Sequence, residues 1–503
     1  MAEIVPHILA ALPIAVAALL AFALGEGRAA KVAGMAQSAA LLSFVAALAL
    51  VRSLDAVTAV MLVLVTFIGF VVVRYSGSYL RAEPGQARFT GWLCATLASV
   101  ILFVAAATLP MLIVAWVATS LFLHRLLLFY PERAAAQRAA RKKFVTARIG
   151  DVALIGAAAC LWLAYRSIDI ATILAAARDG VGGGWAIGGA TLLALAAVLK
   201  SAQFPTHGWL TEVMETPTPV SALLHAGVIN AGGFLLIRFA DVMLLAPGVL
   251  AILVMIGGLT AIIGGLVMLT QPAVKTSLAW STIAQMGFMI LQCGLALFPL
   301  ALLHIVAHSL YKAHAFLASG GAVERIAAAA RPGPIAVPGP KAVFGAFGLA
   351  LGIYAIVGLA FGVWHKSPQA IALGAILIFG TAYLIAQGLA DAAPRALTRV
   401  TALYATAAAV GYFALQAGAS WLMAGTLPAT PAPGPLEWAL IVLAVISFGM
   451  VAVAQAMFPL WAYHPAAAGL RVHLANGLYA NALFDRLLGG WSISKSSQVL
   501  ETR

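Results

Sequence analysis

Three histidines and a lysine lie in one stretch of apolar sequence, "ALLHIVAHSLYKAHAFLASG", at residues 301–320. His304, His308 and Lys312 follow one another at intervals of four residues. Four residues advance an α-helix by slightly more than one turn, so successive members are offset by only about 40° and share one helix face. Imidazole groups, and amines when desolvated, take up and release protons near neutral pH. The row therefore predicts a proton relay.

Two other interpretations of this row stay open. The polar side chains could pack against neighbouring helices and form hydrogen bonds with them. The HxxxH spacing of His304 and His308 could also belong to a zinc site, although no glutamate follows the first histidine and Lys312 would repel the metal ion. The three cysteines of the chain lie far apart and form no CxxC pair. We therefore expect neither a metal nor another cofactor in this chain.

A second set of polar residues lies at residues 197–233, in "AVLKSAQFPTHGWLTEVMETPTPVSALLHAGVINAGG". Lys200 ends an apolar run and precedes Pro205, so we expect the helix to break or kink there. Broken helices in membranes are tolerated where they line a water-filled cavity. His225 falls about two turns inside the next predicted helix, too deep to reach the membrane surface. Snorkelling remains an alternative explanation for Lys200 alone.

Two further lysines lie near the ends of predicted spans. Lys275 opens a span that carries about one polar residue per turn, a pattern that fits either a water-lined face or hydrogen bonding between helices. Lys366 follows His365 and precedes Pro368 at the end of another span, where snorkelling is the ordinary explanation. We include both lysines in the candidate proton path.

These residues need helices that cross a membrane to position them. Of the 503 residues, 63% are hydrophobic and only 9% are charged, a composition that a soluble protein of this length could not bury. About 20 apolar residues span the hydrocarbon core as a helix, and about 14 or 15 segments meet that condition. The sequence therefore predicts an all-α polytopic membrane protein with one transmembrane body, residues 1–460. Residues 461–503 contain an amphipathic segment that could lie on membrane lipid or on a partner protein.

The net charge of +13 comes largely from basic residues in the predicted loops. Lys and Arg accumulate in cytoplasmic loops of membrane proteins, and here they follow the first, third and fifth spans, at residues 28–31, 74–88 and 133–148. This pattern predicts a multi-pass protein of the cell inner membrane with its N-terminus outside. The sequence has no zinc-finger spacing and no aromatic-basic RNA-binding motif, so we do not expect it to bind nucleic acid.

Five stretches of the sequence resemble the antiporter-like subunits of respiratory complex I and of Mrp antiporters. The resemblance implies two inverted five-helix repeats, each with a broken helix, around a hydrated chain of Lys, His and Glu residues that carries protons. It gives Lys200, His225 and Lys312 roles in the proton path, and Lys366 would match the lysine of the second broken helix. The stretches are "RIGD" (148–151), "LKSAQFP" (199–205), "PTPVSALLHA" (217–226), "VKTSLAWSTIAQMGFM" (274–289) and "HSLYKAHAFLASG" (308–320).

The sequence departs from that family in two places. The family usually has Trp-Glu in the fifth span, and its glutamate pairs with the first lysine, whereas Val117 follows Trp116 here. Asp151, in the "RIGD" stretch, is the nearest candidate acid to replace that partner of Lys200. The chain also stops soon after its last predicted span, where the large complex I subunit continues into a long lateral helix.

Within this group, "HSLYKAHAFLASG" and the tail "VHLANGLYANALFDRLLGGW" are similar to the membrane subunit of DAB-type inorganic-carbon pumps. That resemblance implies a subunit that conducts a cation, expected to be the proton, and is not itself an enzyme. Hydration of CO2 to bicarbonate would take place on a large cytoplasmic zinc-binding subunit similar to β-carbonic anhydrases. Two alternatives stay open: a membrane subunit of a complex I-like redox enzyme, and an Mrp-type Na⁺/H⁺ antiporter.

Overall fold

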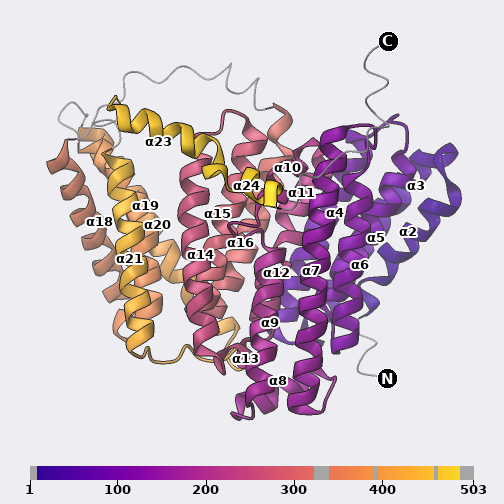
Figure 1. Ribbon diagram of the computed structural model, residues 1–503, viewed down its shortest axis with the longest axis horizontal. Coiled ribbons are helices and arrows are strands. Elements are labelled where there is room, and N and C mark those ends of the chain that lie inside the picture. The colour runs from indigo at the N-terminus through magenta and orange to yellow at the C-terminus, as the bar shows by residue number, and fades with distance from the viewer. Residues whose placement is uncertain (1–7, 322–338, 390–394, 458–462, 488–503) are drawn as a thin grey trace.

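The computed structural model describes residues 8–321, 339–389, 395–457 and 463–487, and every named element in this part of the chain is a helix (Figure 1). Among the described residues, eleven helices are long and apolar enough to cross a membrane, and three shorter helices are also apolar. The predicted all-α, multi-pass membrane fold is therefore confirmed. The predicted boundary between residues 460 and 461 lies outside the described residues.

The first five helices form an up-and-down group. Side chains cap the N-termini of two of these helices. Asp55 accepts a hydrogen bond from the backbone N–H of Thr58 at the start of the third helix, and Thr108 accepts one from that of Met111 at the start of the fifth. The carboxylate of Glu26 accepts hydrogen bonds from backbone N–H groups in the first turn of the fourth of these helices, so the first connection and that turn lie on the same face. The helices are α2 (Leu12–Leu24), α3 (Ala29–Leu50), α4 (Ala56–Tyr79), α5 (Gln86–Val104) and α6 (Leu109–Leu127).

The middle of the chain contains two interruptions inside the bundle. The helix α9 (Gly184–Lys200) ends at Lys200, where the sequence predicted a break, and residues 201–207 form turns before α10 (Gly208–Glu212). The second interruption, at residues 227–230, separates α11 (Thr218–Ala226) from α12 (Ala231–Arg238). Both interruptions place irregular backbone within the protein body, where side chains can satisfy it. The other elements of this region are α7 (Ala134–Tyr165), α8 (Ile170–Arg178) and α13 (Ala240–Leu244).

Glycines allow α14 (Pro247–Met268) and α15 (Val274–Gly294) to approach closely. A Cβ added at Gly287 of α15 would lie 2.5 Å from the backbone nitrogen of Ala261, and one added at Gly264 would lie 2.8 Å from the backbone nitrogen of Ala284. The next helix, α16 (Phe298–Leu317), packs against α4, α11 and α15. The helix that carries the histidine–lysine row therefore lies inside the bundle.

The last four long helices build a second apolar core beside the main one. Phe347, Phe379 and Phe413 are among its buried side chains, and a smaller cluster joins this group to α14, α15 and α16. Lys366 lies in the connection between two of these helices and not inside a helix. The four helices are α18 (Pro340–Ala360), α19 (Pro368–Gly388), α20 (Arg395–Leu422) and α21 (Pro435–Ala456).

The C-terminal segment crosses one face of the bundle (Figure 1). The helix α23 (Pro465–Ala475) lies over helix ends, and α24 (Ala480–Leu487) reaches α10. Gln271, after the end of α14, donates a hydrogen bond to the backbone oxygen of Ala475 (3.3 Å). We call this side the α24 face, and the opposite side, where α8 and α13 lie, the α8 face. The basic connections after α2, α4 and α6 lie on the α24 face.

Candidate functional site

The histidine–lysine row lies on the uninterrupted helix α16. Lys312 and His308 are buried, with 0% and 4% of their surface exposed, and His304 is half-buried. The ring centroids of His304 and His308 are 6.0 Å apart. Eight residues of helix, about 12 Å along its axis, separate His304 from Lys312. The structure thus brings these three side chains together over a substantial part of a hydrocarbon core that is about 30 Å thick.

Neighbouring helices supply backbone acceptors to this row. Lys312 Nζ donates a hydrogen bond to the backbone oxygen of Leu278 on α15 (3.0 Å). His308 Nε2 lies 3.2 Å from the backbone oxygen of His225 on α11, and because a carbonyl oxygen can only accept, this nitrogen is the donor. Among the described residues, no carboxylate forms an ion pair with Lys312. The amine therefore has a carbonyl oxygen as its hydrogen-bond partner, and the centroid of the Tyr311 ring lies 5.5 Å away.

Two histidines of this site, His304 in the row and His225 beside it, each have one ring nitrogen without a hydrogen-bond partner among the protein atoms described. His225 is fully buried; its Nδ1 lies 3.0 Å from Thr282 Oγ1, and its ring stacks on Phe316 with 4.4 Å between the ring centroids. His304 Nδ1 lies 2.8 Å from Gln292 Oε1. The Nε2 atoms of both histidines are buried and have no hydrogen-bond partner among the protein atoms described. Buried polar atoms normally have a partner, protein or water, so these two favour a hydrated path.

Lys200, where α9 ends, faces an aromatic ring and not an acid. Its Nζ lies 4.2 Å from the centroid of the Trp116 ring. The indole nitrogen of Trp116 donates a hydrogen bond to Asp151 Oδ1 (2.9 Å), and Arg148 forms an ion pair with the same carboxylate (2.7 Å). Asp151 is close enough to interact electrostatically with Lys200 but does not contact it. Val117, at the position of the missing glutamate, packs among apolar side chains.

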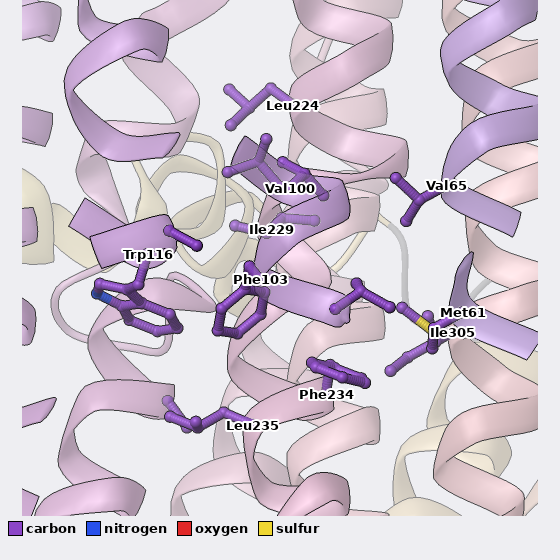
Figure 2. Close-up of a cluster of buried hydrophobic side chains, with 14 of the residues drawn as sticks. Met61, Val65, Val100, Phe103, Trp116, Leu224, Ile229, Phe234, Leu235 and Ile305 are labelled. Carbon is purple, nitrogen blue, oxygen red and sulfur yellow. The ribbon is translucent and has the colours of Figure 1, made fainter. Parts of the chain in front are cut away.

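An apolar cluster holds Trp116 in this position (Figure 2). Phe103 packs between two other rings: its centroid lies 5.5 Å from that of Trp116 and 5.4 Å from that of Phe234. Figure 2 shows that the cluster continues to Met61 and to Ile305, which belongs to α16. Apolar side chains therefore fill the space between Trp116 and that helix.

One buried lysine of α7 escaped the sequence analysis. Lys143 is 5% exposed, and its Nζ donates hydrogen bonds to the backbone oxygen (2.8 Å) and the hydroxyl (3.1 Å) of Ser120. Arg148 donates a hydrogen bond to the same hydroxyl (3.1 Å). Lys143 belongs to the basic run at residues 133–148, which the sequence analysis treated as a loop. In the structure α7 begins at Ala134 and buries this lysine against α6.

Polar side chains also connect the Lys200 region with α16. Ser201, the residue after Lys200, donates a hydrogen bond to the backbone oxygen of Ile229 (3.3 Å). The neighbouring Asn230 donates one to Ser309 Oγ on α16 (2.8 Å). Asn230 is 1% exposed, and its Oδ1 has no hydrogen-bond partner among the protein atoms described. The second interruption therefore supplies polar side chains between Lys200 and Lys312, a connection that depends on the folding of the chain.

The structure places Lys275 and Lys366 at the two faces of the bundle. Lys275 is half-buried in the first turn of α15, on the α24 face. Lys366 lines a pocket of about 420 Å³ on the α8 face together with His365 and Leu300. Leu300 lies one helical turn before His304 on α16. In the described part of the chain, no three His, Cys, Asp or Glu side chains come together as a metal site would require.

Two family models match the chain: "NADH:quinone oxidoreductase/Mrp antiporter, TM" at residues 106–331, and "NADH-Ubiquinone oxidoreductase (complex I), chain 5 N-terminus" at residues 46–90. The chain is 40% identical over 446 residues to the probable inorganic carbon transporter subunit DabB2 of Halothiobacillus neapolitanus, which covers 88% of this chain and 80% of the relative. It is 47% identical over 275 residues to the probable inorganic carbon transporter subunit DabB of Hydrogenovibrio crunogenus, over 53% of this chain and 52% of the relative.

More distant relatives cover the same region. The NAD(P)H-quinone oxidoreductase chain 5 of Synechocystis sp. is 36% identical over 276 residues, which cover 54% of this chain and 40% of that protein. The solved Mrp complex from Dietzia sp. DQ12-45-1b has the same fold, with a TM-score of 0.58, 24% identity, and an alignment over 100% of this chain and 59% of the other. Because the DabB2 subunit is similar over most of both chains, this chain belongs to the family of antiporter-like membrane subunits of the complex I and Mrp type, to which the DabB subunits are related.

Proposed function

We propose that this chain is the proton-conducting membrane subunit of an energy-coupled complex that accumulates inorganic carbon as bicarbonate. The row of His304, His308 and Lys312, with His225 beside it, carries the proposal. Ionisable residues inside a membrane are costly, and in membrane proteins they mark ion pathways and proton relays. Four such residues in contact with one another or with the same helices are difficult to explain by packing alone.

Protons move along this row by exchange between imidazole, amine and water. Lys312 is the least exposed lysine in the described part of the chain and has a neutral carbonyl as its hydrogen-bond partner, so it can lose its proton without leaving a carboxylate unpaired. His308 and His304 continue the route along α16 toward the pocket that Lys366 lines on the α8 face. Lys200 and Asp151 form a second proton-binding site, which Asn230 and Ser309 connect to the row.

The α24 face is the cytoplasmic side in this proposal. The basic connections after α2, α4 and α6 lie there, and such residues accumulate in cytoplasmic loops. This orientation places the protein in the cell inner membrane with its N-terminus outside. It also places α23 and α24 on the side where a cytoplasmic subunit would bind.

The partner in this proposal is a cytoplasmic zinc-binding subunit of the β-carbonic-anhydrase-like, DabA type, where zinc-bound hydroxide attacks CO2. Proton movement does useful work only if it is coupled to a second process. The printed names of the relatives DabB2 and DabB describe inorganic carbon transporter subunits. The match to DabB2 extends over 446 residues, against 276 for the quinone oxidoreductase chain 5, and this difference favours carbon transport over a redox role.

Co-expression in a host that lacks carbonic anhydrase tests the proposal. The chain should co-purify with the zinc subunit, and the pair should raise cellular inorganic carbon and restore growth. An uncoupler should abolish accumulation, and Lys312→Met should have the same effect while the complex stays intact, because methionine keeps the length of the side chain but carries no proton. Lys31→Met, at an exposed position in α3, is the matched control and should behave like the wild type.

Three results would contradict the proposal: rescue by this chain alone, accumulation that persists after every ion gradient is removed, or normal accumulation by a well-assembled Lys312→Met complex. Co-purification with redox subunits would instead support the complex I-like alternative.

A further inference from the structure

A separate cluster of charged side chains lies under α24 and includes neither Lys312 nor Lys200. Lys142 of α7 is only 1% exposed and contacts two carboxylates from different elements: Glu212 Oε1 at the end of α10 (3.0 Å) and Asp485 Oδ1 of α24 (2.5 Å). Asn481 of α24 contacts the same ammonium group and donates a hydrogen bond to Glu212 Oε1 (2.8 Å). Arg138 lies at the edge, with its Nε 3.7 Å from Glu212 Oε2.

The two acids are more exposed than the lysine that holds them. The side chains of Glu212 and Asp485 are 16% and 26% exposed, whereas that of Lys142 is 1% exposed. Asp485 is therefore the more accessible acid on the α24 face, while Glu212 Oε2 is buried without a hydrogen-bond partner among the protein atoms described. One buried ammonium group therefore holds two carboxylates from different elements beside each other.

Below the cluster, polar atoms without partners lead toward Lys200. His207 is fully buried; its ring centroid lies 4.8 Å from that of Trp280, and neither of its ring nitrogens has a hydrogen-bond partner among the protein atoms described. Gln203 Oε1, in the same turn region, has none either. Both residues belong to the seven-residue break that begins directly after Lys200 and ends at His207, before α10. Buried atoms of this kind normally bind ordered water.

Close contacts connect this break to the cluster. A Cβ added at Gly208, the residue after His207, would lie 3.1 Å from Lys142 Nζ and 2.5 Å from Asn481 Cγ. A Cβ added at Gly477, before α24, would lie 3.0 Å from the Trp280 ring. The segment that contains α24 therefore packs directly on the break, and on the tryptophan that contacts His207.

We propose that Glu212 and Asp485 form the proton-exchange site on the α24 face, and that His207 passes protons between this site and Lys200. This inference depends on the proposed proton-conducting function. A proton from water binds one carboxylate, moves through water to a ring nitrogen of His207 and then to the Lys200 amine, and each group returns to its starting form when the proton leaves. Because Asp485 belongs to α24, this helix contributes a proton-binding group to the path.

A chemical replacement of the carboxylate tests this assignment. In the full chain, within the purified complex and reconstituted into liposomes, Asp485→Cys should lower proton flux at least about tenfold, because a positioned acid–base group commonly contributes a factor of 10²–10⁴. Reaction with iodoacetate attaches a new carboxylate to the thiol and should restore much of the flux. Reaction with iodoacetamide attaches a neutral amide of nearly the same shape and should restore none.

Matched controls separate the carboxylate from the chemistry of labelling. Asp179→Cys places a thiol at an exposed acid on the α8 face, and neither reagent should change its flux. The wild type receives both reagents as well, since Cys94 and Cys293 are fully buried and Cys160 lies half-buried in α7. Size-exclusion elution shows whether each variant remains assembled.

The outcomes distinguish failure of this inference from failure of the proposed function. If Asp485→Cys conducts like the wild type, or if the amide restores flux as well as the carboxylate does, α24 only docks and the exchange site lies elsewhere. If the wild type conducts no protons, or if Lys312→Met conducts normally, the proposed function itself is wrong and this inference fails with it. Loss of flux that only the carboxylate restores supports the assignment.

Discussion

Asp151→Asn tests whether this carboxylate replaces the missing acid at Val117. The substitution removes the negative charge and keeps the size of the side chain. Because the indole nitrogen lies about 2 Å from the centre of its ring system, the contacts of Trp116 place Lys200 Nζ no more than about 9 Å from Asp151 Oδ1. At an effective dielectric constant of about 20, a pair of unit charges at that distance interacts by roughly 2 kcal/mol. Loss of this interaction changes the protonation equilibrium constant of the lysine about 30-fold.

We therefore expect Asp151→Asn to lower proton flux by up to about 30-fold, close to the loss caused by Lys200→Met. The double variant should be no worse than Lys200→Met alone, because coupled groups are not additive. Trp116→Phe is the matched control for geometry: it keeps an aromatic ring near Lys200 and removes the hydrogen bond to Asp151. Its flux should fall between those of the wild type and Asp151→Asn.

The assay is proton uptake by liposomes that contain the purified complex, followed with a pH-sensitive dye after a potassium diffusion potential is imposed. Each variant is compared at equal amounts of assembled protein. Wild-type flux in Asp151→Asn, combined with a large loss in Lys200→Met, would refute the reasoning and indicate that another subunit provides the acid. Additive losses in the double variant would show that the two residues act independently.

Two predictions concern stability. Burial alone would raise the pKa of the Asp55 carboxyl, but Arg238 (2.7 Å) and the hydrogen bonds at the start of α4 hold it below its ordinary value. The ion pair therefore stabilises the fold above pH 4, and this contribution is lost as the pH falls below the ordinary value of 3.8 through the folded-state pKa. Asp55→Asn should lower the melting temperature in detergent at pH 7 and change it much less at pH 3; an equal change at both pH values would contradict the assignment. Gly287→Ala should also lower the melting temperature, because its Cβ would meet the backbone of Ala261, whereas Gly265→Ala in α14 meets nothing and serves as the control. Equal melting temperatures for the two alanine variants would contradict the close α14–α15 packing.

The sequence predicted the class of fold because membrane helices follow from local composition. A run of about 20 apolar residues must form a helix in a bilayer, since every backbone group has to be satisfied within the segment. The break after Lys200 was also predictable, because Pro205 is a local signal. The boundaries of the helices were less predictable. Lys143 has the same local sequence pattern as a lysine in a loop, and only the structure, in which α7 begins at Ala134, shows that it is buried.

Part of the candidate site could likewise be predicted from the sequence. His304, His308 and Lys312 lie on one helix, so their spacing alone places them on one face. Lys200 and Asp151 are far apart in the chain, and no local pattern indicated that Trp116 would lie between them. An indole can bind a carboxylate at its edge and a cation on its face, but this use depends on how three separate helices are packed.

The sequence by itself determined that the chain crosses a membrane many times, that α16 carries a proton-competent row, and that the usual glutamate is replaced by Val117. Each of these properties depends on residue type or on spacing within one helix. Only the tertiary structure decided which carbonyl faces Lys312, and that α24 brings Asp485 to Lys142, 343 positions earlier in the chain. Contacts of this kind depend on the packing of distant segments, where side-chain shape and desolvation select partners that local sequence does not specify.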